Sequence, residues 1–385
     1  MIKKLKLSNI CKIQAGGTPM RKNKEYWENG NINWCKISDL KYKYVNDTEE
    51  KITQKGLDKS SAKLLKKGTI LYTIFATIGE VSILNIDSAT NQAIAGLEII
   101  NDMADKEYLY YFLKSKKEEM IKIGRGVAQN NINLTILKEL EIDVPDIEKQ
   151  KEIANQLNKI QKLIDIKEEQ KCLYEVLIKS KFVEMFGELS NSKYPTVKLS
   201  SIADVGSSHR VFTTEFVENG IPFYRGTEIG LLANQEKPKD CYYISEEHYF
   251  KICDDSTRPK IGDLLIPSIC NKGQVWMVDT TEPFYYKDGR VLSISPKEGK
   301  INHKYFHQFM KYKTVKEYSK LGSGSTFAEF KIFILKDFDV ILPPIELQNQ
   351  FADIVKQIDK QKFEVQKNLE AMKNLQENLM NKYFN

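Results

Sequence analysis

Apolar residues gather in short runs bounded by glycine and polar turns. Residues 69–75 (TILYTIF) and 264–269 (LLIPSI) are predominantly apolar over the length of a buried strand, and each run follows a glycine turn. Segments 106–121 and 303–318 instead place apolar residues at helical spacing. Short strands with turn punctuation and a few helices predict an α+β fold.

Two long helices follow these mixed regions. Pro145 and Pro343 each end a predicted strand and open a helix of about 35 residues, which would span roughly 50 Å. Apolar residues recur there at steps of 3, 4 or 7, and in the second helix Gln361 and Asn368 occupy the skipped positions. Such a stripe needs a partner helix, so we expect an antiparallel coiled coil. The alternative is that each helix packs only on its own domain. The predicted packing residues are Ile153, Leu157, Ile160, Ile164, Ile354, Ile358, Val365 and Met372.

The chain is a tandem repeat of one unit. From residue 124 onward the two copies align at an offset of 198 residues. The best-matched segments are 6–10 with 198–202, 32–40 with 221–229, 67–71 with 261–265, and 136–138 with 334–336. We therefore predict two similar mixed α/β domains in tandem, separated and spaced by the two long helices. The predicted boundaries are 1–145 and 191–342 for the domains, and 146–190 and 343–385 for the helices.

Composition places the chain among folded proteins of more than one domain. It has 385 residues, of which 41% are hydrophobic and 29% charged. The N-terminus lacks the apolar core of a signal peptide, and the longest apolar run, 69–78, is about half of a membrane span. The six cysteines include no CxxC pair, so we expect reduced thiols and a cytoplasmic location.

The net charge of +6 is unevenly distributed. Residues 1–150 carry a net +4 and residues 191–342 a net +2, whereas the two helical segments are neutral. A mild positive excess confined to the two domains is compatible with a phosphate backbone as partner.

Motifs for covalent chemistry are missing. The sequence has no GxxxxGK[ST], GxSxG or HExxH pattern. His303 and His307 would share a helix face, but no third ligand of the HExxH type accompanies them, so we expect no metal site. The pair Asp254 and Asp255 is interpreted as a solvated turn. We predict a non-catalytic chain, and two related basic domains held apart by helices suggest recognition of two DNA segments at a fixed distance.

The chain resembles the specificity subunits of Type I restriction-modification systems in several motifs that follow one another in a fixed order. In the first copy the motifs are 6–10 (KLSNI) followed by 16–19 (GGTP), 67–71 (KGTIL) with Gly79, and Val144-Pro145 leading to 148–150 (EKQ). In the second copy they are 198–202 (KLSSI), 262–265 (GDLL) with Gly273, and 342–344 (LPP) leading to 346–348 (ELQ). The second copy has 206–209 (GSSH) in place of GGTP, which suggests that the two halves read different half-sites.

The resemblance implies two target recognition domains that each read half of an asymmetric, interrupted DNA sequence. The helices would set the gap and dock two modification subunits, which methylate adenine with S-adenosylmethionine. Restriction subunits, where present, would add ATP- and Mg-dependent translocation and cleavage. These cofactors would belong to the partners, and none is expected on this chain.

Base recognition requires side chains that present donors or acceptors in a groove. The alternative for each candidate is an ordinary solvated loop residue; Asn91 and Gln92 could equally form turn hydrogen bonds, and Arg290 could simply flank a hairpin. The DNA-binding candidates are Lys36, Thr77, Asn91, Gln92, Arg125, Gln129, Arg225, Asn271, Lys272, Arg290, Ser323 and Ser325.

Two other functions stay open at this point. One is an orphan or silent DNA-binding specificity protein without an active methyltransferase partner. The other is a detached recognition half of an enzyme with its methyltransferase on the same polypeptide. Because the first motif begins at Lys6 and the second repeat ends at Asn385, we expect no further domain.

Overall fold

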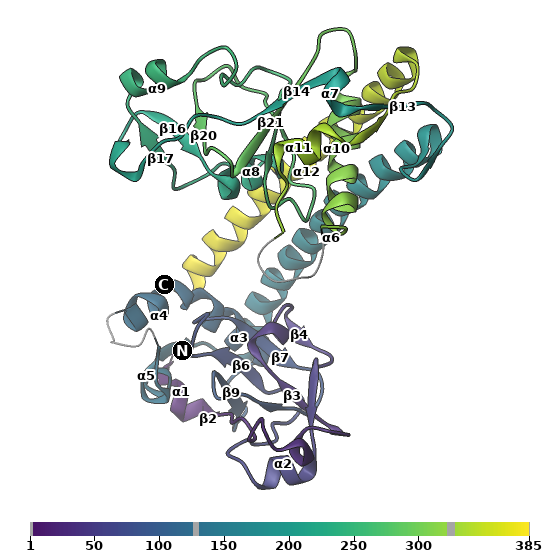
Figure 1. The fold of residues 1–385 in the computed structure, drawn as a ribbon. Coiled ribbons are helices and arrows are strands. Elements are labelled where there is room, and N and C mark those ends of the chain that lie inside the picture. The colour runs from purple at the N-terminus through teal and green to yellow at the C-terminus, as the bar shows by residue number, and fades with distance from the viewer. Residues whose placement is uncertain (1–2, 126–130, 322–327, 385) are drawn as a thin grey trace. The chain divides into compact units, whose positions relative to one another are not determined.

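The structure is a computed structural model that describes residues 3–125, 131–321 and 328–384 (Figure 1). The chain divides into two compact units, one of residues 1–169 with 366–385 and the other of residues 170–365. Each unit therefore contains part of both long helices, α6 (Ile147–Phe186) and α12 (Ile345–Phe384).

The first domain is built on a five-stranded sheet in the order β2-β9-β6-β7-β4 and a three-stranded sheet in the order β5-β3-β8. Only the pairs β4–β7 and β3–β8 of these sheets are parallel, and a separate antiparallel pair joins β1 to β10. The strands are β1 (Lys3–Lys6), β2 (Cys11–Ala15), β3 (Ile32–Cys35), β4 (Tyr44–Val45), β5 (Glu50–Ile52), β6 (Ile70–Thr73), β7 (Val81–Leu84), β8 (Ala89–Thr90), β9 (Ile94–Ile99) and β10 (Glu141–Val144). The helices are α1 (Leu7–Ile10), α2 (Gln54–Asp58), α3 (Lys106–Ser115), α4 (Lys117–Arg125) and α5 (Leu134–Glu139).

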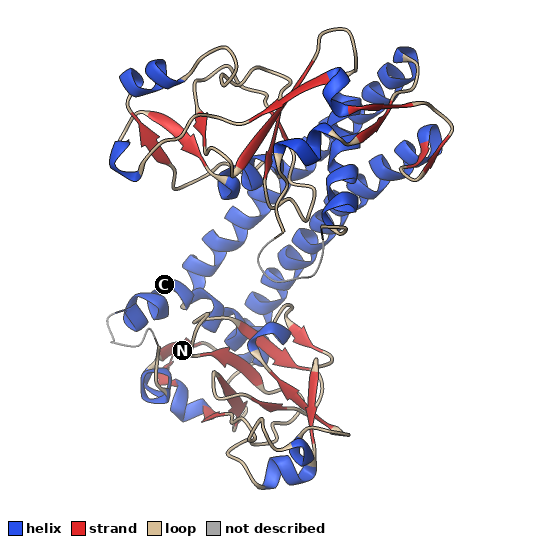
Figure 2. Ribbon diagram, in the orientation of Figure 1, coloured by secondary structure: helices blue, strands red, loops and turns tan. Residues whose placement is uncertain are grey.

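The second domain repeats this plan. Its sheets have the orders β14-β21-β18-β19 and β15-β17-β16-β20, and the parallel pair β3–β8 recurs as β16–β20 (Figure 2). The strands are β11 (Gly187–Glu188), β12 (Asn191–Ser192), β13 (Thr196–Lys198), β14 (Ala203–Gly206), β15 (Phe216–Val217), β16 (Ile221–Tyr224), β17 (Tyr242–Ile244), β18 (Leu264–Pro267), β19 (Trp276–Met277), β20 (Tyr285–Tyr286), β21 (Val291–Pro296) and β22 (Asp339–Ile341). The helices are α7 (Leu199–Ile202), α8 (Gly226–Ala233), α9 (Glu246–Ile252), α10 (His303–Tyr318) and α11 (Ile332–Lys336).

The predicted buried strands are the centres of the two cores. Side chains alternate along a strand, so Ile70 and Tyr72 of β6 pack in the cluster that includes α3, whereas Leu71 packs in a separate cluster. In the second domain Leu264 and Leu265 of β18 divide in the same way. The predicted glycine turns before both strands are confirmed. Gly68 and Gly262 have φ of +97° and +91°, a backbone conformation that favours glycine.

The helix predicted at 303–318 is confirmed as α10, but the segment 106–121 differs from its prediction. It forms two helices, α3 and α4, which are separated at Lys116 and extend to Arg125. Asp105 caps α3 by accepting hydrogen bonds from Glu107 N and Tyr108 N, at 2.9 and 3.0 Å.

The long helices pack antiparallel within each unit, as predicted. In the first unit the Tyr383 hydroxyl donates to Gln156 Oε1 at 2.9 Å, and Gln376 Nε2 donates to Gln161 Oε1 at 3.0 Å. In the second unit the Phe182 and Phe351 rings lie 5.7 Å apart. In both cases later residues of one helix meet earlier residues of the other. No helix among the described residues is long and apolar enough to cross a membrane.

The buried positions of α12 include residues that are not in the predicted packing stripe. Gln361 and Asn368 are exposed, while the adjacent Lys362 and Leu369 are buried. Lys362 faces inward because its ammonium forms an ion pair with Glu175 of α6. Of the predicted packing residues, Ile153, Leu157, Ile164, Ile358 and Val365 are buried, and Ile160, Ile354 and Met372 are half-buried.

Glu175 joins three helices, because its carboxylate also binds Lys311 of α10 at 2.9 Å. Burial opposes its ionisation, but the charges of Lys311 and Lys362 prevail and lower the pKa of Glu175 to about 2, from 4.5. This contribution to stability is present above about pH 4.5 and is lost as the pH falls toward 2.

We expect Glu175→Ala to lower the free energy of unfolding by about 1–3 kcal/mol at pH 7, because it leaves Lys362 buried without its partner. The value lies below that of a fully buried pair, since the Glu175 side chain is 40% exposed. The difference from wild type should shrink at pH 3, where the wild-type pair is also weakened. Denaturant unfolding at both pH values measures it.

Glu168→Ala is the matched control. Glu168 pairs with Lys373 at 2.8 Å between the same helices, but both side chains are about half exposed. Its loss should cost less than about 0.5 kcal/mol. Equal losses in the two variants would contradict a special role for the Glu175 pair.

Candidate nucleic-acid interface

Three polar segments meet where the parallel strands β3 and β8 of the first domain end. Lys36 follows β3, Asn91 follows β8, and residues 16–21 follow β2. The backbone N–H of Asn91 donates to Cys35 O at 3.0 Å, and that of Gly17 donates to Thr90 O at 2.8 Å. The structure thus places the predicted residues Lys36, Asn91 and Gln92 at one edge.

Lys36 is held by carboxylates of its own domain. Its ammonium lies 2.9 Å from Glu49 and 3.0 Å from Glu50, and hydrogen bonds from the lysine to these two groups raise its pKa above the usual value. Lys36 N also donates to Asp39 Oδ2 at 2.8 Å. Contact with a base would require Lys36 to leave at least one of these carboxylates.

Asn91 forms a turn hydrogen bond, the alternative left open by the sequence, whereas Gln92 bonds to a distant loop. Asn91 Oδ1 accepts a hydrogen bond from Ala93 N at 3.1 Å. The Thr18 hydroxyl donates a hydrogen bond to Gln92 Oε1. Gln92 is nevertheless exposed, whereas Asn91 is half-buried. The bond between Thr18 and Gln92 connects the loop after β2 to the segment after β8.

The corresponding edge of the second domain carries Arg225 after β16. Its guanidinium binds Glu228 through two bonds, Nε–Oε2 at 3.0 Å and Nη2–Oε1 at 2.6 Å, and lies 4.6 Å from the centre of the Tyr242 ring. Hydrogen bonding to Glu228 raises the pKa of Arg225. Arg225 therefore has a fixed plane but one edge already occupied.

The remaining described candidates lie on exposed loops. Thr77 is in the loop after β6, and Asn271 and Lys272 are in the equivalent loop after β18. Arg290 flanks the turn before β21, as the sequence allowed, and forms an ion pair with Glu329. Arg125 is the last residue of α4; its side chain, together with Gln129, Ser323 and Ser325, lies outside the described residues.

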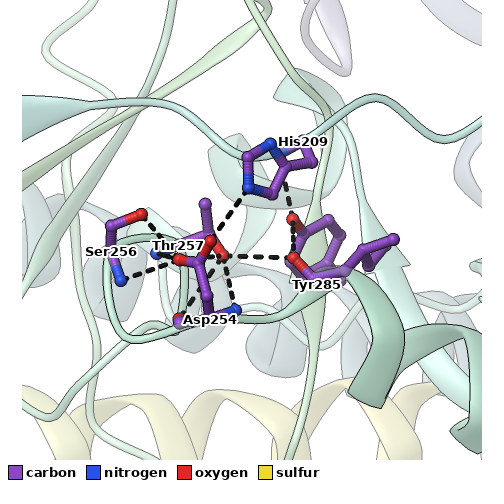
Figure 3. Close-up of polar contacts among 6 residues, drawn as sticks. His209, Asp254, Ser256, Thr257 and Tyr285 are labelled. Carbon is purple, nitrogen blue, oxygen red and sulfur yellow. Dashed lines mark hydrogen bonds and ion pairs between the residues drawn. The ribbon is translucent and has the colours of Figure 1, made fainter.

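A polar cluster holds the loop after β14, where the second copy has GSSH in place of GGTP (Figure 3). His209 Nε2 lies 3.0 Å from Asp254 Oδ2, and His209 N donates to the Tyr285 hydroxyl at 2.9 Å. Asp254 also accepts from the backbone and hydroxyl of Ser256, at 2.8 and 2.6 Å, and from Thr257 N at 3.0 Å. Hydrogen bonds from Ser256, then from His209, hold the pKa of Asp254 well below its usual range. The turn predicted to be simply solvated thus positions His209.

Sequence reasoning did not name two arginines, Arg21 in the loop after β2 and Arg210 in the loop after β14. Arg21 forms an ion pair with Glu50, and its guanidinium carbon lies 3.9 Å from the centre of the Trp27 ring. Arg210 lies 5.2 Å from the centre of the Phe212 ring. Comparison of the two loops could have found both, since each contains an arginine within six residues of the preceding strand.

His303 and His307 do not form the metal pair that their spacing permits. His307 Nε2 lies 2.8 Å from Val275 O, and burial lowers the pKa of His307 to about 4. Across residues 3–125, 131–321 and 328–384, no group of three or more His, Cys, Asp or Glu side chains could hold a metal ion.

Comparisons with known proteins agree with the repeated architecture. The family model described as "Type I restriction modification DNA specificity domain" matches residues 2–172 and again residues 191–372. The MjaIX specificity subunit of a Type I restriction enzyme from Methanocaldococcus jannaschii is 36% identical over 186 residues, which are 47% of this chain and 43% of that protein. The MjaVIII specificity subunit from the same organism is 26% identical over 343 residues, or 82% of this chain and 76% of the relative.

A solved structure has a similar fold. It is a chain from a study of complex assembly and conformational transition of the type I R-M system, with a TM-score of 0.54 and 16% identity, covering 100% of this chain and 97% of that one. Its likeness supports the fold alone. The first relative above is matched over less than half of its own length. The family is one of DNA specificity domains, in agreement with the predicted non-catalytic role. With both halves matched by the same model, this chain belongs to the Type I restriction modification DNA specificity domain family and contains two copies of that domain.

Proposed function

We propose that this chain is the DNA-recognition subunit of a Type I restriction-modification complex and reads an asymmetric, two-part target with one domain per half-site. The observation that carries the proposal is the duplication of a family-matched domain whose polar edge has different side chains in each copy. Lys36 stands after β3 where Arg225 stands after β16, so similar frameworks present different donors to a groove.

The long helices would set the distance between the half-sites and dock two modification subunits. In the first unit Leu163 and Ile166 of α6 are each 47% exposed, and in the second unit Leu173 and Val176 are 58% and 54% exposed. Large apolar side chains exposed in this way favour a protein partner. The modification subunits would supply S-adenosylmethionine, and any restriction subunits ATP and Mg, in the cytoplasm.

An orphan or silent specificity protein is the second candidate. It would have the same fold and polar edges, so the distinction rests on whether DNA is modified in the cell.

Deletion of the gene should abolish adenine methylation at one interrupted, two-part sequence, because recognition resides in this chain and chemistry in its partners. Single-molecule sequencing of the host genome with and without the gene measures this. Reintroducing the gene should restore the same motif. An unchanged set of methylated motifs would favour the orphan alternative.

Inserting four residues into both helices, after Glu169 and after Val365, should lengthen the gap between the half-sites by about two base pairs. Four helical residues add about 6 Å, and each base pair adds about 3.4 Å. The half-site sequences should stay the same. Four residues inserted between Leu189 and Ser190, outside both helices, form the control and should leave the gap unchanged. An unchanged gap in the double insertion would contradict the spacing role.

A further inference from the structure

In each domain, one loop carries an exposed arginine that lies over an aromatic ring. This loop follows β2 in the first domain and β14 in the second. In the first domain this loop is residues 16–23, after β2, and in the second it is residues 207–212, after β14. Arg21 lies over both Trp27 and Trp34, at 3.9 and 4.7 Å from the ring centres, and Arg210 lies over Phe212. A guanidinium held over an aromatic ring by a cation–π interaction is restricted in its position, so its N–H donors have fewer accessible directions.

The base of the first loop is fixed by close backbone contacts. A Cβ atom on Gly16 would lie 2.2 Å from Thr90 O, so only glycine fits there. Trp34 Nε1 donates to Gly17 O at 2.9 Å, and the Trp34 side chain is 2% exposed. The same tryptophan therefore anchors the loop and supports its arginine.

The charge around Arg21 favours a neutral ligand over an anion. Its Nη1 is paired with Glu50, which also binds Lys36 at 3.0 Å, and the Arg21 side chain is 51% exposed. The carboxylate offsets the positive charge that would attract a phosphate. Because a guanidinium has five N–H donors, the pair with Glu50 leaves further donors for the edge of a base.

The second loop is fixed by side chains instead. Ser207 Oγ donates to Val291 O at 2.8 Å, and the Ser208 hydroxyl donates to Tyr286 O at 2.5 Å. His209 is held by Asp254 and Tyr285 as described above. Arg210 directly follows these three anchored residues, so its backbone position is determined although its side chain is exposed.

We propose that Arg21 and Arg210 are specificity-determining residues that each read a guanine in the major groove, one in each half-site. This inference rests on the proposed function. Arginine forms paired hydrogen bonds with O6 and N7 of guanine, the commonest specific contact between a side chain and a base. A side chain that lies over an aromatic ring and is carried by an anchored loop is restricted toward such a contact before DNA binds.

The test replaces each arginine with lysine, which keeps the charge but loses the planar fork. The methylated motif is sequenced in the host carrying each variant, and the purified full-length chain is titrated with duplexes that vary at each position of the target. We expect Arg21→Lys to reduce the preference for guanine at one position of one half-site by about tenfold to a hundredfold. Arg210→Lys should have the same effect in the other half-site only.

Matched controls carry a positive charge in the same regions. Lys22→Gln alters the neighbour of Arg21, and Arg258→Lys alters an arginine of the second domain that pairs with Asp255 at 4.0 Å. Both should leave every base preference unchanged. Asp254→Ala should weaken the guanine preference assigned to Arg210 because it releases His209, whereas Asp255→Ala should not. Thermal unfolding of each variant checks folding, and Arg21→Gln is the second variant if Arg21→Lys does not fold.

Each result separates the inference from the proposed function. A folded Arg21→Lys variant with the wild-type motif and wild-type base preferences would overturn the inference. A uniform loss of affinity for all sequences, with weaker salt dependence, would assign Arg21 to a phosphate and would also overturn it. If the wild-type chain directs no methylation and selects no sequence, both the proposed function and the inference fail.

Discussion

The last aromatic residue of each long helix completes the core of a domain, and the rest of the structure depends on this packing. Phe384 of α12 lies 5.1 Å from Tyr108 and 6.0 Å from Phe112 in the first unit. Phe186 of α6, 198 positions earlier, lies 4.9 Å from Tyr305 and 5.5 Å from Phe351 in the second. Replacing a buried phenylalanine by alanine typically costs about 3–5 kcal/mol. Residues of both long helices therefore contribute to the core of each domain, and the long helices are inseparable from the domains' stability.

A buried glutamine fixes the start of each long helix against its domain. Gln150 Oε1 accepts from Asp105 N at 2.7 Å and Gln150 Nε2 donates to Pro145 O at 2.8 Å; Gln348 forms the same bonds with Asn302 N and Pro343 O, at 2.9 and 2.8 Å. A buried side-chain amide whose donor and acceptor are both hydrogen-bonded fixes the orientation of the helix at little cost in free energy. A buried amide without these partners would be destabilising. This gives a physical reason why proline and glutamine recur at the same spacing, as Pro145 and Gln150 in the first copy and Pro343 and Gln348 in the second.

The fold could be predicted because the repeat and the helical spacing are properties of the sequence itself. Lys362 was missed because hydropathy treats lysine as a surface residue, and only the packed structure places Glu175 beside its ammonium. The candidate site was predicted less well for a similar reason. Position after a strand is the sequence signal for Lys36 and Arg225, but their carboxylate partners, Glu50 and Glu228, become visible only with side-chain geometry. Arg21 was missed because Trp27 and Trp34 form its platform only after folding.

The way the two loops are anchored explains how one framework can carry two different loops. In the first domain Gly17 uses its backbone N–H to bind Thr90 O, and in the second Ser208 uses its hydroxyl to bind the equivalent carbonyl, Tyr286 O. The link between loop and strand is thus kept while the path of the loop changes. Arg21 consequently stands six residues after the end of β2, and Arg210 four residues after the end of β14. Because the anchors are interchangeable in chemistry, the loops can diverge in length and contact residues without disturbing the sheets. The domain cores and the helices are then constrained by packing, whereas the loops can differ in sequence between the two copies.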